Sequence, residues 1–364
     1  MRVEQLYCLD DAPLSKSKVE CIAIRIERTS ERLRAFRERS SRLRFRVGTE
    51  STKDASGLRR TPLHPLASLS MKPLDGMNAI VTGATRGVGR GCAVELAAQG
   101  AHVTITGRTL HEGDSSWPGS LESTIAEAEA LGGRIEGIVC DHRDDEQVQS
   151  VFQRVVADRD RLDLLVNNAF LIPDDMDPSL PFWETSLDCW DDMHQVGARS
   201  AYVGTWNAAP IMIRQGKGLI ANVSSEGARF YTLHPAYGAA KSALDRTARD
   251  CGHELEPHNV ATITVWPSFV TTERMLALDA EEWKLDLDGA ESPRFTGRGI
   301  AALLLDENVI SRSGRVVTTR QLAEQYGFVD VDGTLPKGAP DPGEPAPLFP
   351  PEVSPELAPE SALD

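Results

Sequence analysis

Hydrophobic and polar positions in the central part of the chain alternate between two periods. Short apolar runs bounded by turn residues recur between longer segments whose apolar positions follow helical spacing. Strands that alternate with helices in this way form a parallel sheet with helices on both faces, so we predict an α/β fold with a doubly wound parallel sheet. The predicted strands are residues 79–82, 102–106, 135–140, 162–166, 219–223, 260–265 and 315–317. The predicted helices are one that ends near Gln99 and residues 121–131, 144–158, 187–214, 237–255 and 299–306, with residues 273–296 irregular.

The two ends of the chain lack this pattern. Residues 1–70 hold 15 Lys and Arg against 9 Asp and Glu, and their sparse apolar positions define no helical face. An Arg-rich segment can be a nucleic-acid or membrane-surface arm, but we prefer the interpretation of a disordered basic leader. Residues 333–364 contain nine prolines and many glutamates, which is typical of a disordered tail. We therefore expect one folded domain, residues 71–332, between two disordered ends.

Composition narrows the class of protein. The 364 residues carry a net charge of −15, which argues against nucleic acid as a partner. No apolar run approaches the roughly 20 residues that span a bilayer, and the first residues contain no apolar signal segment. The six cysteines are scattered, without a Cys-x-x-Cys pair or a Cys/His cluster. We therefore expect reduced thiols, no metal site and a cytoplasmic location.

A glycine-rich turn, TGATRGVG at residues 82–89, follows the first predicted strand. Glycines in this place permit a tight turn, close approach of the backbone to a pyrophosphate and close packing of helix on strand. The helix that follows presents free N–H groups and a positive dipole end to phosphates. We therefore predict that the turn binds a dinucleotide through Gly83, Arg86, Gly87, Val88 and Gly89.

The second predicted strand indicates which dinucleotide is bound. An NAD site usually places Asp or Glu at the end of this strand to hold the ribose 2′-hydroxyl. Here the strand runs into Gly107-Arg108-Thr109, without a carboxylate. Arg86 and Arg108 can pair with a 2′-phosphate, although both can also be solvated loop residues. The sequence therefore favours NADP(H) over NAD(H).

Tyr237 and Lys241 are four residues apart at the start of a predicted helix, so the phenol and the ammonium lie on one face. A free phenol has a pKa of about 10 and is a poor acid–base group at neutral pH. A nearby Lys⁺ and an oxidised nicotinamide favour the phenolate. Ser224 and Ser225 end the preceding strand, where a hydroxyl can hydrogen-bond a reacting carbonyl oxygen. These residues are candidates for catalysis.

Six motifs in this order resemble those of the short-chain dehydrogenase/reductase family. The match covers about residues 77–331 and implies a single-domain Rossmann fold that interconverts a carbonyl and an alcohol with NAD(P). The strings WDDMHQVGARSAYV, DCGHEL and YGFVDVDG, with a shortened serine loop, are similar to one branch of this family. The six motifs are the turn at residues 82–89, Asp141, Asn167-Asn168-Ala169, Ser224-Ser225, Tyr237 with Lys241, and Trp266-Pro267.

The resemblance also implies a role for individual residues. Tyr237 would be the acid–base group, Lys241 would lower its pKa and hold the nicotinamide ribose, and a serine would orient the carbonyl. The family is usually oligomeric through its long helices, so a homo-oligomer is implied. Asp141 and the asparagines, taken alone, are also suited to capping strand ends. The further implied cofactor contacts are Asp141 to adenine, Asn168 and Ala169 to the adenosine ribose, and Val270 and Thr272 to the nicotinamide carboxamide.

The sequence departs from the family pattern at three positions. Gly197 stands where the family usually has an Asn in the long helix, so the side chain that the family uses in its proton relay is absent here. Phe170 and Ser268 replace glycines near the expected nicotinamide site and narrow it. The shortened serine loop leaves Ser224 and Ser225 as alternatives, and alignment of the strand end favours Ser225.

Substrate contacts in such a fold come from loops beyond the carboxyl ends of the strands. Here these loops are residues 170–185, 226–235 and 269–295, and their aromatic residues suit an apolar ketone, aldehyde or steroid-like alcohol. We predict an NADP(H)-dependent carbonyl reductase or alcohol dehydrogenase, and the alternative is a non-catalytic NADP-binding regulator or scaffold. The aromatic loop residues are Trp183, Phe230, Tyr231, Trp283 and Phe295.

Overall fold

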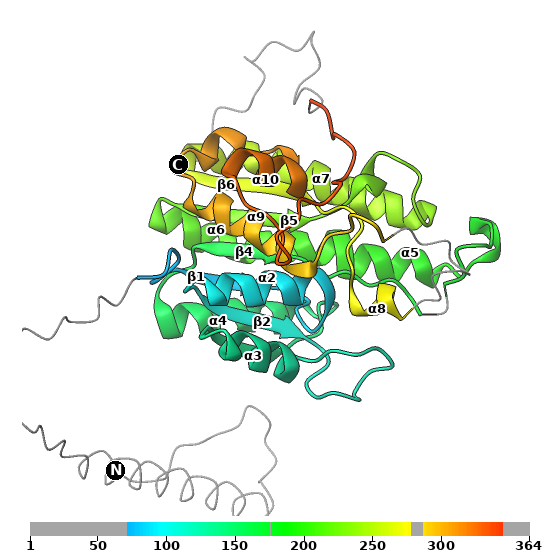
Figure 1. Cartoon of the computed structure of the whole chain (residues 1–364), viewed down its shortest axis with the longest axis horizontal. Helices are drawn as coiled ribbons and strands as arrows, with labels where there is room; N and C mark the ends of the chain where they lie inside the picture. The colour runs from blue at the N-terminus through cyan, green and yellow to red at the C-terminus, as the bar shows by residue number, and fades with distance from the viewer. Residues whose placement is uncertain (1–70, 175, 278–286, 345–364) are drawn as a thin grey trace, which may run out of the picture. The chain divides into compact units, whose positions relative to one another are not determined.

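The structure is a computed structural model that describes residues 71–174, 176–277 and 287–344 (Figure 1). Its centre is a seven-stranded sheet with the strand order β3-β2-β1-β4-β5-β6-β7. Every neighbouring pair of strands is parallel. All seven predicted strands are therefore confirmed. The strands are β1 (Asn78–Val81), β2 (His102–Gly107), β3 (Arg134–Val139), β4 (Leu164–Asn167), β5 (Gly218–Val223), β6 (Val260–Trp266) and β7 (Val316–Thr318).

Helices cover both faces of the sheet, as the doubly wound prediction requires (Figure 1). Side chains alternate across the strands, so Ala79 and Val81 of β1 join one core cluster and Ile80 joins the other. The central strands are buried on both faces, which explains their continuous apolar sequences. One face carries α2 (Gly87–Ala98), α3 (Leu121–Ala130), α9 (Pro293–Leu305) and α10 (Thr319–Tyr326), and the other carries α4 (Asp145–Arg159), α6 (Ser200–Gln215) and α7 (Pro235–Leu255).

The strand order places the candidate residues at one edge of the sheet. The chain moves outward from β1 to β2 and β3, then returns to β4 on the other side of β1. A parallel sheet opens a crevice at the carboxyl ends of its strands where the order reverses, which here is between β1 and β4. The glycine-rich turn after β1 and the Asn167-Asn168-Ala169 segment at the end of β4 therefore meet.

The predicted long helix at residues 187–214 is three consecutive segments. They are α5 (Asp188–Met193), a π-helical turn η2 (His194–Arg199) and α6. A π-helical turn widens the hydrogen-bond ring by one residue and is common at functional sites. Here it contains Gly197, the position at which the sequence departs from the family pattern.

The region after β6 contains more helix than predicted. A short helix, α8 (Glu273–Leu276), begins at the Thr272 cap, and α9 begins at Pro293, six residues before the predicted start. Proline suits the first turn of a helix, so Ser292-Pro293 is a start signal that the prediction overlooked. Helix α10 was also missed, although Thr318 and Gln321 form a reciprocal capping box at its N-terminus.

The folded body extends past residue 332, where the prediction placed the start of the tail. Arg320 donates from Nη1 to the carbonyl oxygen of Pro336 at 2.7 Å, and the N–H of Lys337 donates to Gly289 at 3.0 Å. Residues 333–344 therefore pack on the domain. The expected leader, residues 1–70, and the rest of the expected tail, residues 345–364, lie outside the described residues. None of the helices in the described part of the chain is long and apolar enough to cross a membrane.

Candidate active site

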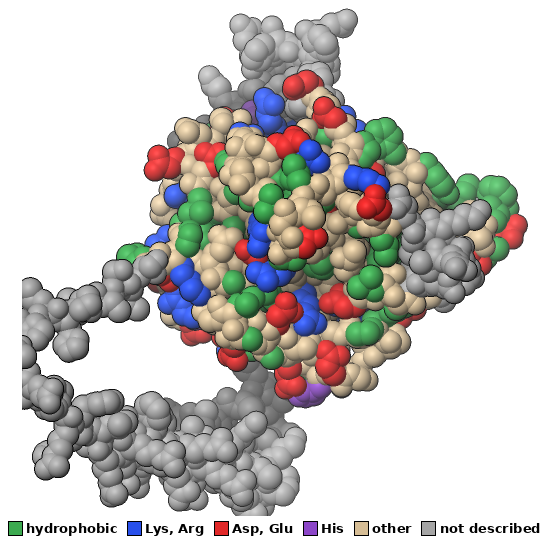
Figure 2. All heavy atoms as spheres, in the orientation of Figure 1, with side chains coloured by type: hydrophobic (Ala, Val, Ile, Leu, Met, Phe, Trp, Pro, Cys, Tyr) green, Lys and Arg blue, Asp and Glu red, His purple; other side chains and the backbone are tan. Residues whose placement is uncertain are grey.

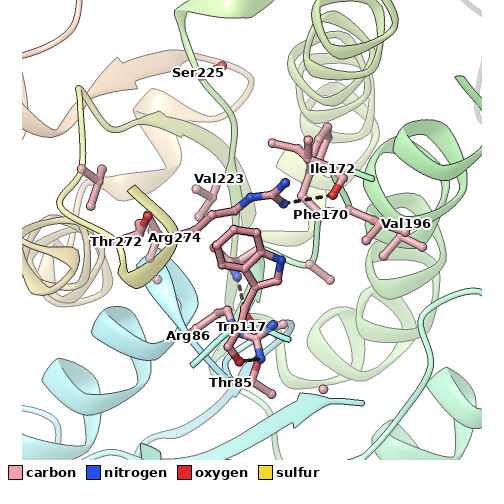
Figure 3. Close-up of a pocket in the computed structure, with 18 of the residues that line it drawn as sticks. Thr85, Arg86, Trp117, Phe170, Ile172, Val196, Val223, Ser225, Thr272 and Arg274 are labelled. Carbon is pink, nitrogen blue, oxygen red and sulfur yellow. Dashed lines mark hydrogen bonds between the residues drawn. The ribbon is translucent and has the colours of Figure 1, made fainter. Parts of the chain in front are cut away.

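A cavity of about 740 Å³ opens at the carboxyl ends of the strands. Figure 3 shows that its walls come from distant segments, with Thr85 and Arg86 from the glycine-rich turn and Arg274 from the region after β6. All of the candidate site residues except Gly89 line it. The residues that the structure brings together here are Gly83, Arg86, Gly87, Val88, Arg108, Asp141, Asn168, Ala169, Ser225, Tyr237, Lys241, Val270 and Thr272.

Glycine is required at two places in the turn for different reasons. Gly83 has a φ of +64°, and a Cβ there would lie 2.7 Å from the Cα of Ala169. Gly89 has an ordinary φ, but a Cβ would lie 2.3 Å from Nδ2 of Asn168. That amide in turn donates to the carbonyl oxygens of Thr82 and Gly83 at 2.9 and 3.0 Å. Gly89 therefore lets the turn close against β4, and Asn168 holds it there.

The N-terminus of α2 already donates a hydrogen bond to an anionic oxygen. The N–H of Gly87 donates to Oε2 of Glu273 at 2.7 Å. Free N–H groups and the helix dipole favour negative charge at this position, whether it belongs to a carboxylate or a phosphate. Together with the glycines that let a ligand approach the backbone, this donor set fits the pyrophosphate of a dinucleotide.

The two arginines predicted to bind a 2′-phosphate differ in their partners. Arg86 donates from Nε to the carbonyl oxygen of Pro118 at 2.8 Å and from Nη2 to Gly119 at 2.9 Å, so it secures the loop after β2. Arg108 is exposed at the rim of the cavity and has no hydrogen-bonded partner among the described residues. Its guanidinium is therefore available to a ligand.

Two loops and helix α8 meet above this end of the cavity. The Trp117 indole donates from Nε1 to Asp174 at 2.7 Å. The guanidinium of Arg274 lies 4.7 Å from the Trp117 ring, 3.6 Å from Asp174, and donates to the carbonyl oxygen of Ile172 at 3.1 Å. Figure 3 shows Arg274 extending across the cavity above Trp117. Sequence analysis missed these residues, because their meeting depends on loops that are far apart in the chain.

Burial sets the charge of His142, which lines the cavity in the loop after β3. His142 is buried, hydrogen-bonded to Thr106 at 2.8 Å, and desolvation lowers its pKa to about 4, so it is neutral. Asp141 is less buried and accepts the N–H of Arg143 at 3.0 Å. The Asp141 carboxyl thus caps the end of β3 as well as lining the cavity.

At the inner end of the cavity, Ser225 and Tyr237 contact each other. Their hydroxyl oxygens are 2.8 Å apart. Ser225 extends from the end of β5 and also accepts the N–H of Gly227, while Pro235 at the first turn of α7 sets the start of the helix that carries Tyr237. Ser224 points away, since its hydroxyl donates to the carbonyl oxygen of Lys241 at 3.3 Å. Of the two alternatives, the structure brings Ser225 to the phenol.

Lys241 is buried at the wall of the cavity. Its Nζ donates to the carbonyl oxygen of Val223 at 3.3 Å and lies 4.0 Å from the centroid of the Phe170 ring. Desolvation lowers the pKa of Lys241 to about 8, against the opposing charges of Asp245 and Glu226. The ammonium form is therefore retained at neutral pH by a narrow margin.

Burial dominates the pKa of Tyr237. Desolvation raises this pKa to about 12, which outweighs the hydrogen bond from Ser225 that lowers it. The lowering that the resemblance implies, by Lys241 together with an oxidised nicotinamide, stays a prediction. The neutral phenol is the form present over the physiological range, which suits a proton donor.

Asp245, one turn beyond Lys241, was also missed. It accepts the indole N–H of Trp266 at 3.1 Å, and burial raises its pKa to about 6. Trp266 begins the Pro267-Ser268 segment that lines the cavity, so Asp245 ties the end of β6 to α7. The signal for it was the spacing of Tyr237, Lys241 and Asp245 by one helical turn each.

The two departures at Phe170 and Gly197 are sterically linked. A Cβ on Gly197 would lie 2.6 Å from Cε2 of Phe170, so the ring occupies the space of a side chain at position 197. The third departure, Ser268, donates its N–H to the buried carboxylate of Glu291 at 2.9 Å. Burial raises the pKa of Glu291 to about 7.

The predicted aromatic loop residues do not form the substrate side of the cavity. Trp183, Phe230 and Tyr231 are exposed and do not line it. Figure 2 shows apolar atoms gathered at the end of the molecule that carries α5 in Figure 1. Phe295 is fully buried against Phe328, and Trp283 lies outside the described residues. Apolar residues that line the cavity include Phe170, Ile172, Val196, Phe269 and Met275, and of these Phe170 and Ile172 pack in the same cluster as Tyr237.

Comparisons with known proteins agree with this geometry. The family model for short chain dehydrogenases matches residues 77–283. Dehydrogenase/reductase SDR family member 1 is 40% identical to the chain in Mus musculus, over 72% of this chain and 85% of the mouse protein. The Homo sapiens protein of the same name is 38% identical over the same shares. These relatives confirm the branch that the sequence strings indicated.

Solved structures share the fold. The structure of a proposed NAD(P)-dependent gluconate 5-dehydrogenase from Beutenbergia cavernae, with NADP bound at low occupancy, is 28% identical. It superposes with a TM-score of 0.59 over 69% of this chain and 98% of the other. The structure of a proposed dehydrogenase from Xanthomonas campestris gives a TM-score of 0.61 at 23% identity, over 74% of this chain and 98% of the other, which supports the fold alone. The chain therefore belongs to the short-chain dehydrogenase/reductase family and is an NAD(P)-dependent enzyme of that family.

Proposed function

We propose that the protein reduces a carbonyl compound to an alcohol, and runs the reverse reaction, with NADP(H) as its preferred cofactor and Tyr237 as the acid–base group. One observation carries the proposal: the Ser225 and Tyr237 hydroxyls are 2.8 Å apart at the enclosed end of a cavity whose other end is the glycine-rich turn. NADPH, when bound, supplies a hydride to the carbonyl carbon.

The side chains supply the remaining chemistry. Ser225 donates a hydrogen bond to the carbonyl oxygen and orients it. As the hydride arrives, the electron pair of the C=O bond moves to this oxygen, which takes the phenolic proton of Tyr237. The nearby charge of Lys241 stabilises the phenolate that remains, and its ammonium holds the nicotinamide ribose. Burial removes water, so these charges act at short range in a medium of low polarity.

The preference for NADP(H) rests on the rim of the cavity. Arg108 follows β2, where an NAD site usually has a carboxylate, and its guanidinium has no hydrogen-bonded partner among the described residues. Arg86 lies close by but is engaged with the loop at residues 117–119. We therefore assign the principal 2′-phosphate contact to Arg108 and a secondary one to Arg86.

We also propose an apolar substrate, a homo-oligomeric assembly and a cytoplasmic location. Phe170 and Ile172, which line the cavity and pack in the same cluster as Tyr237, favour an apolar substrate. The outer face of α6 exposes Tyr202 and Trp206, which supports self-association through the long helices. We propose a cytoplasmic location, which the scattered cysteines support, and no nucleic-acid partner, because the chain carries a net charge of −15. Residues 1–70 and the end of the tail are proposed to lie outside the catalytic domain.

The alternative is a non-catalytic NADP-binding regulator or scaffold. Gly197 supports it, because the side chain that the family uses in its proton relay is absent. The intact contact between Ser225 and Tyr237 favours the enzyme.

Oxidation of NADPH with a panel of aldehydes and ketones separates the two functions. We expect turnover with at least one apolar carbonyl, and we expect Tyr237→Phe to lower it by about 10²- to 10⁴-fold with an unchanged NADPH dissociation constant, because only the proton is lost. Full activity of Tyr237→Phe, or NADPH binding without turnover across the panel, would reject the proposed mechanism.

A further inference from the structure

The ammonium of Lys241 is covered by an aromatic ring. Its Nζ lies 4.0 Å from the centroid of Phe170 and donates a hydrogen bond to the carbonyl oxygen of Val223 at 3.3 Å. The same ring meets Tyr237 edge to face, with the ring centroids 5.5 Å apart. One side chain therefore contacts both members of the Tyr237–Lys241 pair.

The position of this ring depends on Gly197. A Cβ at that residue would approach Cε2 and Cδ2 of Phe170 to 2.6 and 2.8 Å, distances at which one of the two groups must move. Gly197 is buried in the π-helical turn η2, so a side chain added there would point into the packed interior and not into solvent. The ring and the missing side chain are two parts of one arrangement.

We propose that Phe170 is a positioning residue for carbonyl reduction: its ring holds the Lys241 ammonium charged and in place, and Gly197 provides the space that the ring needs. The inference rests on the proposed function, because it assigns Phe170 to the Tyr237–Lys241 pair.

The physical argument is the cost of burying a charge. A fully buried ammonium loses its hydration and needs other groups to replace it. The face of an aromatic ring carries partial negative charge and attracts a cation within about 6 Å. Phe170 supplies this attraction with an uncharged ring. A carboxylate in the same position would also attract the ammonium, but it would compete for the phenolic proton.

Other charged groups offset only part of the effect of desolvation on the pKa of Lys241. Asp245 on α7 and Glu226 on η3 (Glu226–Ala228) favour the ammonium, yet desolvation still lowers its pKa. The ionisable residues of η2 face elsewhere, since His194 bonds to the carbonyl oxygen of Trp190 and Arg199 pairs with Asp145. Loss of the ring therefore moves the deprotonation of the Lys241–Tyr237 pair to lower pH.

The first test is the pH profile of kcat/KM for carbonyl reduction. In Phe170→Leu, which keeps apolar bulk but removes the ring, we expect the alkaline limb to move down by about one pH unit. Phe170→Tyr keeps an aromatic face and should restore the wild-type limb. Phe182→Leu, a phenylalanine exposed outside the cavity, is the matched control and should leave the profile unchanged.

An unshifted alkaline limb in Phe170→Leu would overturn the inference, even if activity fell, because a purely structural role lowers the rate equally at all pH values. If Tyr237→Phe is inactive and this limb does not move, the proposed function stands and only the role of Phe170 fails. Retained turnover in Tyr237→Phe would instead reject both.

The second test is a double-mutant cycle between positions 170 and 197. We expect Gly197→Ala to lower kcat/KM by about tenfold in the wild-type background, because the methyl displaces the ring. In a Phe170→Ala background the same change should have little further effect. Equal effects in both backgrounds would refute the steric link, and thermal melts show which variants are folded. If Gly197→Ala does not fold, the pH profile of kcat/KM in Phe170→Leu decides whether Phe170 has the proposed role.

Discussion

At the inner end of the cavity, Lys241 is buried, Tyr237 is half-buried and both contact the Phe170 ring, whereas at the outer end Arg108 is exposed and Trp117 is half-buried in a loop. The inner groups have pKa values shifted by desolvation, to about 12 and about 8. For Arg108 at the rim, exposure keeps its guanidinium hydrated and subject to screening by salt.

The difference separates two tasks of one site. Proton transfer needs groups whose protonation states are controlled, and burial supplies that control at a cost in stability. Recognition of a phosphate needs charges that can reach a ligand arriving from water, and exposure supplies it. Changes at the inner end should therefore alter the rate and the stability in opposite directions, while changes at the outer end should alter the choice and affinity of the cofactor.

The largest effect is expected at Lys241. In Lys241→Met the buried charge disappears, so turnover should fall by about 10²- to 10³-fold and NADPH affinity should also fall. Stability should rise, because the wild type loses about 3 kcal/mol by burying an ammonium whose pKa drops from 10.5 to about 8. Assays of turnover and NADPH binding, with thermal melts, measure all three.

The sign of the pH dependence sharpens this prediction. The folded state binds the Lys241 proton more weakly than the unfolded state, so the cost is complete below about pH 8 and disappears as the pH approaches 10.5. The melting temperature of Lys241→Met should thus exceed that of the wild type at pH 7, with a smaller gain at pH 9.5. Lys217→Met, at an exposed lysine, is the control. A lower melting temperature for Lys241→Met at pH 7 would contradict the burial argument.

The fold was accessible to sequence analysis because each level of the pattern agreed. Continuous apolar runs marked the buried strands, and the helix periods between them fixed a parallel sheet. The errors fall where local signals are short. Helix α10 spans Thr319–Tyr326, and its capping box is its clearest mark. The turn η2 interrupts the predicted long helix without a proline or glycine pair at its boundary, so nothing local indicated it.

The site was predictable to the extent that it consists of short motifs. Residues such as Ser225, Tyr237 and Lys241 are recognised by spacing, and the structure brings them together. The direction of the Tyr237 pKa was not predictable, because desolvation depends on packing by residues from other elements. The contact between Phe170 and Gly197 was hidden for the same reason, since both departures were visible but their proximity was not.

At the outer end, Arg108→Asp tests the choice of cofactor. A carboxylate after β2 repels a 2′-phosphate and can accept hydrogen bonds from the two ribose hydroxyls of NAD. We expect kcat/KM with NADPH to fall by about 10- to 150-fold and the preference for NADPH to narrow or reverse. Steady-state kinetics with both cofactors, at one ionic strength, give the ratio. An equal or higher kcat/KM with NADH in the wild type would refute the assignment of Arg108.

The smallest effect is expected at Glu273, whose carboxylate accepts the N–H of Gly87 where a pyrophosphate should lie. Glu273→Gln removes one negative charge near the phosphates but keeps an oxygen that can accept the N–H, so NADPH should bind about two- to fivefold more tightly at low salt. The gain should shrink at high salt, because this region is open to solvent. Fluorescence titration with NADPH at two ionic strengths measures both.

Glu127→Gln is the matched control for this change. Glu127 bonds to Nε of Arg90 at 2.7 Å, and Glu273 lies 3.6 Å from the same arginine, so both variants remove a partner of Arg90. Only Glu273 lines the cavity. If both variants tighten NADPH binding equally, the effect comes from Arg90. If Glu273→Gln weakens binding, its carboxylate supports the turn that holds the phosphates, and the outer end then depends on internal charge pairing as the inner end depends on burial.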